Sequence, residues 1–348
     1  MIVFRADASA KIGSGHISRC LVLAETLRRS GQTCHFICRQ LQGDQINKIQ
    51  DKGFDVSLLS AHEQSDAKES AEIISRLNAE LVVVDHYDLG VEWEKFVALF
   101  STAMIMVIDD LVDREHNCDL FLNQNHKADA VVYSKLLPPK CKMLLGTEFA
   151  LLREEFSGLR QLALQRRQNA VLKEILISLG GGDCTEITEK VMAVMSEQHF
   201  DRLRKVTVVS RSITAESMPV SLLRDKLGVS VECIVDADSM SELMTRADLS
   251  IGAAGTTSWE RCCLGLPTVL LTLADNQIAI ARALEEEGAA LLAGDLRLND
   301  WQKGLSGALD MAQSSNKLEA ISVAAAALCD GQGAWRVAKE ILRPIEKV

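Results

Sequence analysis

Short, largely apolar runs alternate with helical patterns along almost the whole chain. Within the helical stretches, apolar residues recur every three or four positions, for example over 16–29 and 67–77. Continuously apolar runs are typical of strands in a parallel sheet whose two faces are both covered by helices. The regular alternation therefore predicts βαβ units. The predicted strands are 2–4, 33–38, 56–59, 81–84, 103–108, 120–122 and 143–145 in the first half, and 174–179, 206–209, 231–235, 249–251 and 268–271 in the second.

The stretch 156–173 separates the two sets of strands, because it is charged, rich in glutamine and without an apolar run. A chain of 348 residues is also long enough for two domains. We predict Rossmann-like domains over 1–165 and 166–348, with the last helical segment, 335–345, crossing back to the first domain. The predicted fold class is therefore α/β, with two Rossmann-like parallel-sheet domains facing across a cleft. Ligands of such sheets bind beyond the carboxyl ends of the strands, so we expect the site in that cleft.

The loop after the first predicted strand has the composition of a site that binds anions. Residues 5–16 have the sequence RADASAKIGSGH and lead into a predicted helix. Gly13 and Gly15 allow close approach of a ligand to the backbone, and the helix start offers unpaired N–H groups and a positive dipole end. A histidine at that position, His16, can act as a base near neutral pH. The alternative interpretation is a tight turn with a surface histidine. The loop matches neither the dinucleotide fingerprint nor a Walker loop.

Polar residues also follow two other predicted strands of the first half, namely Asp85, His86 and Tyr87 after one, and Asp109 and Asp110 after the next. Catalytic residues of α/β sheets gather at such strand ends. Asp85 or Asp109 could orient His16 or bind a sugar hydroxyl. The alternative is that these carboxylates cap helices and hold loops.

Two glycine-rich loops follow strands of the second half. Residues 180–183 are Gly-Gly-Gly-Asp, and three consecutive glycines cost chain entropy that a simple turn does not require. Residues 252–258 are GAAGTTS, whose small side chains and free amides predict a loop that binds a diphosphate. Glu260 could accept hydrogen bonds from both ribose hydroxyls or be a solvated helix position. The segment 275–277 could bind sugar hydroxyls or an N-acyl group, or its first residue could cap the following helix.

Composition narrows the classes of function. Acidic residues outnumber basic ones by 48 to 38, and the net charge of −10 argues against nucleic acid and anionic membranes as partners. The ten cysteines form no C-x-x-C pair, so we expect buried thiols in a reducing compartment and no metal site. No signal-peptide pattern and no apolar run of about 18 residues are present. We expect a soluble, cytoplasmic, monomeric protein without a cofactor.

A set of motifs recurs in a fixed order along the chain. The motifs are RADA and IGSGHISRC within 5–20, VDHY at 84–87, IDDL at 108–111 with CD at 118–119, NQN at 123–125, LLG at 144–146, SLGGGD at 178–183 and GTTSWE at 255–260. In this order they resemble the UDP-2,4-diacetamido-2,4,6-trideoxy-β-L-altropyranose hydrolases of pseudaminic acid biosynthesis. The resemblance spans residues 2 to about 343 and implies the GT-B architecture. The first motif is specific, whereas the glycine loop of the second half is shared with many nucleotide-sugar transferases.

The resemblance also implies roles for individual residues. His16 would activate water for attack on the anomeric carbon, with inversion and release of UDP. Tyr87 and Asn276 would line the sugar pocket, residues 254–257 would hold the diphosphate, Glu260 the ribose, and the main chain near Ile234 the uracil. The expected catalytic residues are His16, Asp85 and Tyr87, and the expected substrate-binding residues are Arg5, Asp7, Gly13, Gly15, His86, Gly181, Gly182, Ile234, Val235, Ala254, Gly255, Thr256, Thr257, Glu260, Asn276 and Gln277.

Two other functions compete with hydrolysis. A glycosyltransferase would use the same UDP-sugar with an acceptor hydroxyl in place of water. The first half shows no basic amphipathic helix that would bring it to a membrane acceptor. A non-catalytic nucleotide-sugar binding protein would keep the second-half loops and would not need His16.

Overall fold

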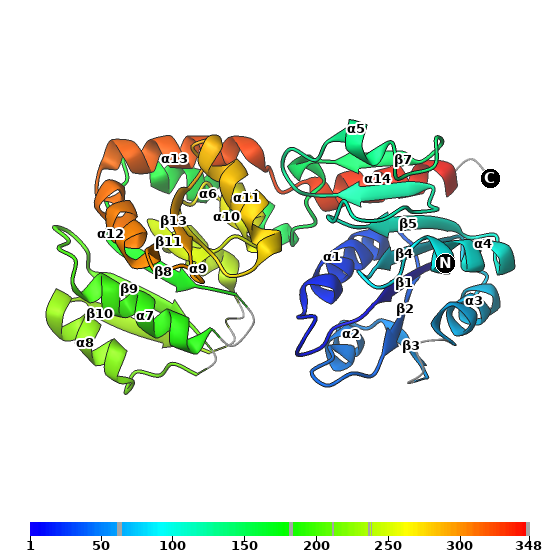
Figure 1. The fold of residues 1–348 in the computed structure, drawn as a ribbon, viewed down its shortest axis with the longest axis horizontal. Helices are drawn as coiled ribbons and strands as arrows, with labels where there is room; N and C mark the ends of the chain where they lie inside the picture. The colour runs from blue at the N-terminus through cyan, green and yellow to red at the C-terminus, as the bar shows by residue number, and fades with distance from the viewer. Residues whose placement is uncertain (61–64, 181–183, 211, 236, 238, 346–348) are drawn as a thin grey trace. The chain divides into compact units, whose positions relative to one another are not determined.

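The computed structural model describes residues 1–60, 65–180, 184–210, 212–235, 237 and 239–345. The chain folds as two compact units. The first consists of Met1–Leu152 together with Gln332–Val348, and the second of Arg153–Gly331. Each unit has its own parallel sheet with helices on both faces (Figure 1).

The described part of the first unit contains a seven-stranded sheet in the order β3-β2-β1-β4-β5-β6-β7, and all of its strand pairs are parallel. The order reverses direction between β1 and β4. The strands are β1 (Ile2–Ala6), β2 (Cys34–Arg39), β3 (Asp55–Leu59), β4 (Leu81–Asp85), β5 (Met104–Ile108), β6 (Leu120–Asn123) and β7 (Lys142–Leu145). The helices are α1 (Gly15–Arg29), α2 (Ile46–Asp51), α3 (Asp66–Arg76), α4 (Val91–Phe100), α5 (Ala130–Tyr133), the short 3-10 helix η2 (Thr147–Phe149) and α14 (Gly333–Ile345).

The apolar strands supply a separate core to each face of this sheet. Successive side chains of a strand point to opposite faces, so Phe4 lies in one core and Val3 in the other. The Phe4 core is completed by α1, α2 and α14, and the Val3 core by α3 and α4. Val337 and Ile341 bring α14 into the first core, and α14, red in Figure 1, lies beside β7.

The described part of the second unit contains a six-stranded parallel sheet in the order β10-β9-β8-β11-β12-β13, which reverses direction between β8 and β11. The strands are β8 (Glu174–Ser178), β9 (Lys205–Val209), β10 (Ser230–Ile234), β11 (Leu249–Ala253), β12 (Thr268–Thr272) and β13 (Leu291–Asp295). The helices are α6 (Glu154–Arg167), α7 (Thr185–Ser196), α8 (Met218–Leu227), α9 (Met240–Arg246), α10 (Thr257–Cys263), α11 (Asp275–Glu286), α12 (Trp301–Ala312) and α13 (Ser315–Leu328).

The predicted fold class of two Rossmann-like parallel-sheet domains is confirmed. The predicted division at 165/166 falls inside α6, whereas the two units divide at Leu152 and Arg153. Strand β13 was not predicted, because its sequence LLAGD is short and contains a glycine. The strand shifts register against β12, and Gly294 there has φ +132°, a conformation that favours glycine.

Candidate active site

The loop between β1 and α1 places His16 in the first turn of α1, beside the point where the strand order reverses. The Ser9 hydroxyl accepts hydrogen bonds from the amides of Lys11 and Ile12. Gly13 has φ +83°, and its amide donates to the Ser9 carbonyl, 2.8 Å away. A side chain at position 13 would be strained in this conformation. The loop is therefore a compact turn that leads directly into the helix.

Asp85, the last residue of β4, orients the His16 ring. Nδ1 of His16 lies 2.5 Å from Oδ1 of Asp85, and Arg19 donates to both oxygens of the same carboxylate at 2.5 and 2.6 Å. Asp85 is completely buried. Burial favours a higher pKa, but Arg19 and His16 outweigh it and hold the pKa of Asp85 below its usual range. A nitrogen of Arg19 also lies 3.2 Å from Nδ1. Because a carboxylate can only accept, Nδ1 donates to Asp85, and Nε2 of His16 has no hydrogen-bond partner in the described part of the chain.

Tyr87 lies edge-on against His16, with the ring centroids 4.7 Å apart. Its hydroxyl donates a hydrogen bond to Oδ1 of Asp110, 2.7 Å away. Burial raises the pKa of Tyr87, and the nearby charge of Asp110 raises it further. Tyr87 is therefore a neutral phenol throughout the physiological pH range.

Arg5, Asp7 and His86 lie in a buried ion-pair network. Arg5 and Asp7 are 0 and 1% exposed, and the guanidinium of Arg5 pairs with Asp7 at 2.8 Å and with Asp66 at 2.6 Å. Nε2 of His86 lies 3.2 Å from Asp7. Burial favours a higher pKa for Asp7, but His86 and Arg5 outweigh it and hold that pKa below its usual range. These contacts engage the charged atoms of Arg5 and Asp7 inside the protein, and the expected binding of substrate by these two residues stays a prediction.

In the second unit, the β11–α10 loop (residues 254–256) presents small residues at the carboxyl end of β11. Ala254 is buried, Thr256 is exposed, and Gly255 and Thr257 are intermediate. The carbonyls of Gly255 and Thr256 accept hydrogen bonds from residues in the first turn of α10. In the described part of the chain, the amides of residues 255–257 donate no hydrogen bond to the protein, and such free N–H groups can bind an anion.

The buried side chain of Arg261 links the residues on either side of this loop. It is 2% exposed and donates to the Ala253 carbonyl at 2.6 Å and to the Ser258 hydroxyl at 2.9 Å. A Cβ at position 252 would lie 2.5 Å from a nitrogen of Arg261 and 3.0 Å from the carbonyl oxygen of Ser178, so a side chain there would displace the guanidinium. Burial lowers the pKa of Arg261 to about 10, so the side chain stays a cation near neutral pH.

Glu260 lies one turn into α10, with its side chain 19% exposed. Arg153, the first residue of the second unit, approaches it to 3.7 Å and also pairs with Glu155 at 3.0 Å. Burial raises the pKa of Glu260 to about 7, although Arg153 opposes that shift. The carboxyl group therefore titrates in the physiological range.

The other residues predicted in the second unit lie outside the β11–α10 loop. The Ile234 carbonyl accepts a hydrogen bond from the Ser210 amide at 3.1 Å, and Val235 is 54% exposed. Gln277 accepts from the Leu273 amide at 3.0 Å and so holds the turn before α11, whereas Asn276 is exposed. Gly181 and Gly182 lie outside the described residues.

Three residues at these sites were not predicted, namely Arg19, Arg153 and Arg261. Arg19 could have been found from the sequence, because a residue three positions after His16 on a helix lies on the same face. Arg153 and Arg261 give no comparable local signal, because their partners are defined only by packing.

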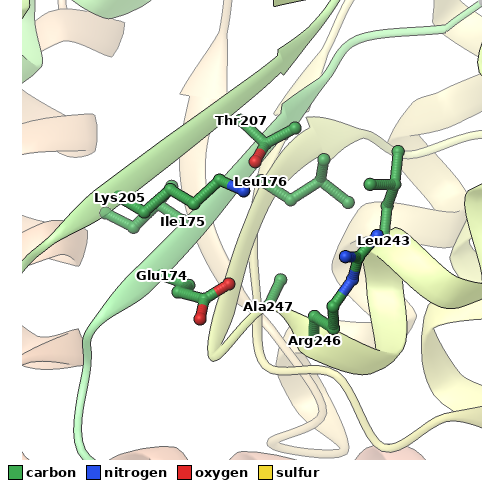
Figure 2. Close-up of a pocket in the computed structure, with 8 residues that line it drawn as sticks. All are labelled: Glu174, Ile175, Leu176, Lys205, Thr207, Leu243, Arg246 and Ala247. Carbon is green, nitrogen blue, oxygen red and sulfur yellow. The ribbon is translucent and has the colours of Figure 1, made fainter. Parts of the chain in front are cut away.

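A small hollow in the second unit lies at the opposite end of the sheet. Figure 2 shows Glu174 and Lys205, the first residues of β8 and β9, beside Arg246 at the end of α9. Its volume is about 10 Å³, room for a single water molecule. This hollow is too small for a nucleotide. The described residues also bring together no group of three or more His, Cys, Asp or Glu side chains that could hold a metal ion. No described helix is long and apolar enough to span a bilayer.

Two Rossmann-like parallel sheets, each with polar groups where its strand order reverses, form the GT-B fold. Residues 174–329 match the family model described as glycosyltransferase family 28 C-terminal domain. The UDP-2,4-diacetamido-2,4,6-trideoxy-β-L-altropyranose hydrolase of Campylobacter jejuni is 29% identical over 289 residues, which cover 82% of this chain and 97% of that protein. The resemblance to this hydrolase family is thereby confirmed.

Solved structures agree on the fold. MurG of Acinetobacter baumannii superposes with a TM-score of 0.72 at 13% identity, covering 98% of this chain and 99% of that one. The UDP-GlcNAc 2-epimerase of Neisseria meningitidis, solved with UDP-GlcNAc bound, superposes with a TM-score of 0.64 at 11% identity, covering 98% and 99% of the two chains. At such identities the likeness concerns the fold alone.

Proposed function

We propose that this protein is a metal-independent hydrolase that releases UDP from UDP-2,4-diacetamido-2,4,6-trideoxy-β-L-altropyranose, with inversion at the anomeric carbon. The observation on which this rests is the His16–Asp85–Arg19 arrangement, which leaves Nε2 of His16 without a hydrogen-bond partner among the described residues, at the carboxyl end of the first sheet. The name of the Campylobacter jejuni relative supports the substrate.

The chemistry needs a single base. Nε2 of His16 would remove a proton from water as its oxygen attacks the anomeric carbon, and UDP would leave with the electron pair of the C–O bond. Asp85 would stabilise the imidazolium that forms. UDP is a good leaving group, so amides of the β11–α10 loop suffice to stabilise its charge without a strong general acid. Attack by water on the face opposite the departing UDP gives inversion.

In the second unit, we propose that residues 254–257 hold the diphosphate and that Glu260 accepts hydrogen bonds from the ribose hydroxyls. The main chain near Ile234 would contact uracil, and Asn276 the sugar. Arg261 would hold the β11–α10 loop in shape and place a buried positive charge beneath it.

The test is incubation of the protein with the UDP-sugar alone. Equal amounts of free sugar and UDP, with the anomer of the sugar identified by NMR before mutarotation, support the proposal. Release of UDP only after an acceptor is added would identify a glycosyltransferase, and binding without turnover a nucleotide-sugar binding protein.

His16→Ala should lower kcat by about 10²–10⁴-fold, because it removes the general base. The affinity for UDP should stay within a few fold, since His16 would contact water and not the nucleotide. His199→Ala is the matched control, because that side chain is 92% exposed, and its turnover should equal that of the wild type. Equal losses of UDP affinity and of turnover in His16→Ala would make His16 a binding residue instead.

A further inference from the structure

Asp110 faces the active site, whereas the neighbouring Asp109 faces away from it. Asp110 accepts the hydrogen bond of the Tyr87 hydroxyl at 2.7 Å on one oxygen and that of the Asn125 side-chain amide at 3.3 Å on the other. Asp109 is 2% exposed and forms an ion pair with Arg114. Tyr87, Asp110 and Asn125 follow β4, β5 and β6, three adjacent strands of the sheet. The sheet therefore brings together residues that are far apart in the sequence.

This hydrogen bond decides what Tyr87 can offer a ligand. A phenol has one proton, and here that proton is directed at a carboxylate. The phenolic oxygen then has only its lone pairs left for another partner. The ring is also fixed edge-on to His16, with the centroids 4.7 Å apart, so any group bound by the phenolic oxygen lies close to the base.

We propose that Asp110 is a positioning residue, which acts through Tyr87. It holds the ring against His16 and makes the phenolic oxygen a hydrogen-bond acceptor, so that Tyr87 selects a sugar with an N–H or O–H group at that position. Asn125 fixes the orientation of the carboxylate. The identity of the ligand rests on the proposed hydrolase function, whereas the state of the Tyr87 proton does not.

The first experiment measures that proton without using activity. The chain has two tyrosines, so ¹³C labelling of the tyrosine Cζ gives two NMR signals, which Tyr133→Phe assigns. Asp110→Asn should lower the pH at which the Tyr87 signal titrates by about one unit or more, because a neighbouring negative charge is removed. Asp113→Asn is the control, since its carboxylate is exposed on the same loop, with the side chain 57% exposed, and the Tyr87 titration should not move. An unchanged Tyr87 titration in Asp110→Asn would overturn the proposal.

The second experiment is a double-mutant cycle on the hydrolysis of the UDP-sugar. Asp110→Asn should lower kcat/KM by about tenfold in the wild type and by less than about threefold in Tyr87→Phe, because a residue that acts through Tyr87 has no further effect without the hydroxyl. The affinity for UDP should not change. Additive losses would show that Asp110 acts independently of Tyr87 and would overturn the proposal. A wild-type protein that releases no UDP would refute the proposed function, and the NMR titration would still decide whether Asp110 controls the Tyr87 proton.

Discussion

At the residue scale, burial and partners divide the carboxylates of the first unit into different classes. Asp85 binds the imidazole of His16 and the guanidinium of Arg19, and Asp110 binds the phenol of Tyr87. Glu94 and Asp109 flank His116, with Nδ1 of His116 2.7 Å from Glu94 and Nε2 3.6 Å from Asp109. Carboxylates of the same unit therefore pair with an imidazole, a guanidinium or a phenol, according to the groups that packing brings beside them.

The His116 cluster should make stability depend on pH. Burial favours a lower pKa for His116, but Asp109 and Glu94 outweigh it and raise the pKa to about 9. A pKa that is higher in the folded than in the unfolded state stabilises the protein fully below about pH 6.5, and this contribution is lost as the pH rises through about 9. We expect the free energy of unfolding to fall by up to about 3 kcal/mol across that window.

Denaturant unfolding at several pH values measures this effect. His116→Gln should have a flatter profile between pH 6 and 9 than the wild type, while His199→Gln, which changes an exposed side chain, should follow the wild type. A His116→Gln profile parallel to that of the wild type would mean that the cluster is not the origin of the pH dependence.

Glu260 should make UDP binding depend on pH. Its pKa of about 7 means that the carboxyl group is protonated below neutrality, and a protonated carboxyl group accepts ribose hydrogen bonds less well. The dissociation constant for UDP, measured by calorimetry, should therefore rise as the pH falls from about 8 to 6. Glu260→Gln should lack this component and retain only the dependence due to the phosphate of UDP. Identical pH profiles for the two proteins would exclude Glu260 from the binding site.

At the element scale, individual glycines decide how closely a helix can approach its sheet. In α12, a Cβ on Gly304 would lie 1.9 Å from the carbonyl oxygen of Ala293 in β13, whereas a Cβ on Gly307 would meet no atom within 4 Å. The two glycines lie in the same helix and differ only in the face that they occupy. Gly304 is therefore required for packing, and Gly307 is not.

This pair gives a matched test of α12 packing. Gly304→Ala should lower the free energy of unfolding by about 1–3 kcal/mol, because the helix must move away from β13. Gly307→Ala should raise it by about 0.5–1 kcal/mol, since alanine is the better helix former. Thermal and denaturant unfolding measure both changes. Equal effects of the two substitutions would show that the close contact with β13 does not limit packing.

At the scale of the whole molecule, the first unit is built from two separate parts of the chain. Helix α14 supplies Val337 and Ile341 to the same core as Phe4. Gly333 lets this helix begin against η2, because a Cβ there would lie 2.3 Å from the carbonyl oxygen of Ala150. The ion pair of Lys142 in β7 with Glu340 adds a second contact. The last helix is therefore part of the first fold.

Ile341→Ala tests this dependence. Ile341 is 0% exposed, and its truncation should cost about 2–5 kcal/mol. The lower stability should appear as faster amide hydrogen exchange in β1 and β4, which belong to the N-terminal part of the chain. Val323→Ala, at a position 67% exposed in α13, should change stability by less than about 0.5 kcal/mol. Unchanged protection of β1 in Ile341→Ala would show that the first unit does not rely on α14.

The sequence by itself determined the fold class, because continuous apolar runs and helical periodicity are local signals. It also placed His16, Asp85, Tyr87 and Glu260 at strand ends or helix starts, where polar residues of parallel sheets collect. Strand β13, with its glycine, depended on packing that the pattern does not encode.

The tertiary structure decided which of these polar groups meet. Asp85 and not Asp109 binds His16, since neighbouring strands β1 and β4 end side by side. Arg5 forms buried ion pairs with Asp7 and with Asp66 from α3. Sequence patterns define the backbone element on which a residue lies. The partner of a buried charge depends instead on strand order and side-chain packing, because these bring together residues that are distant along the chain.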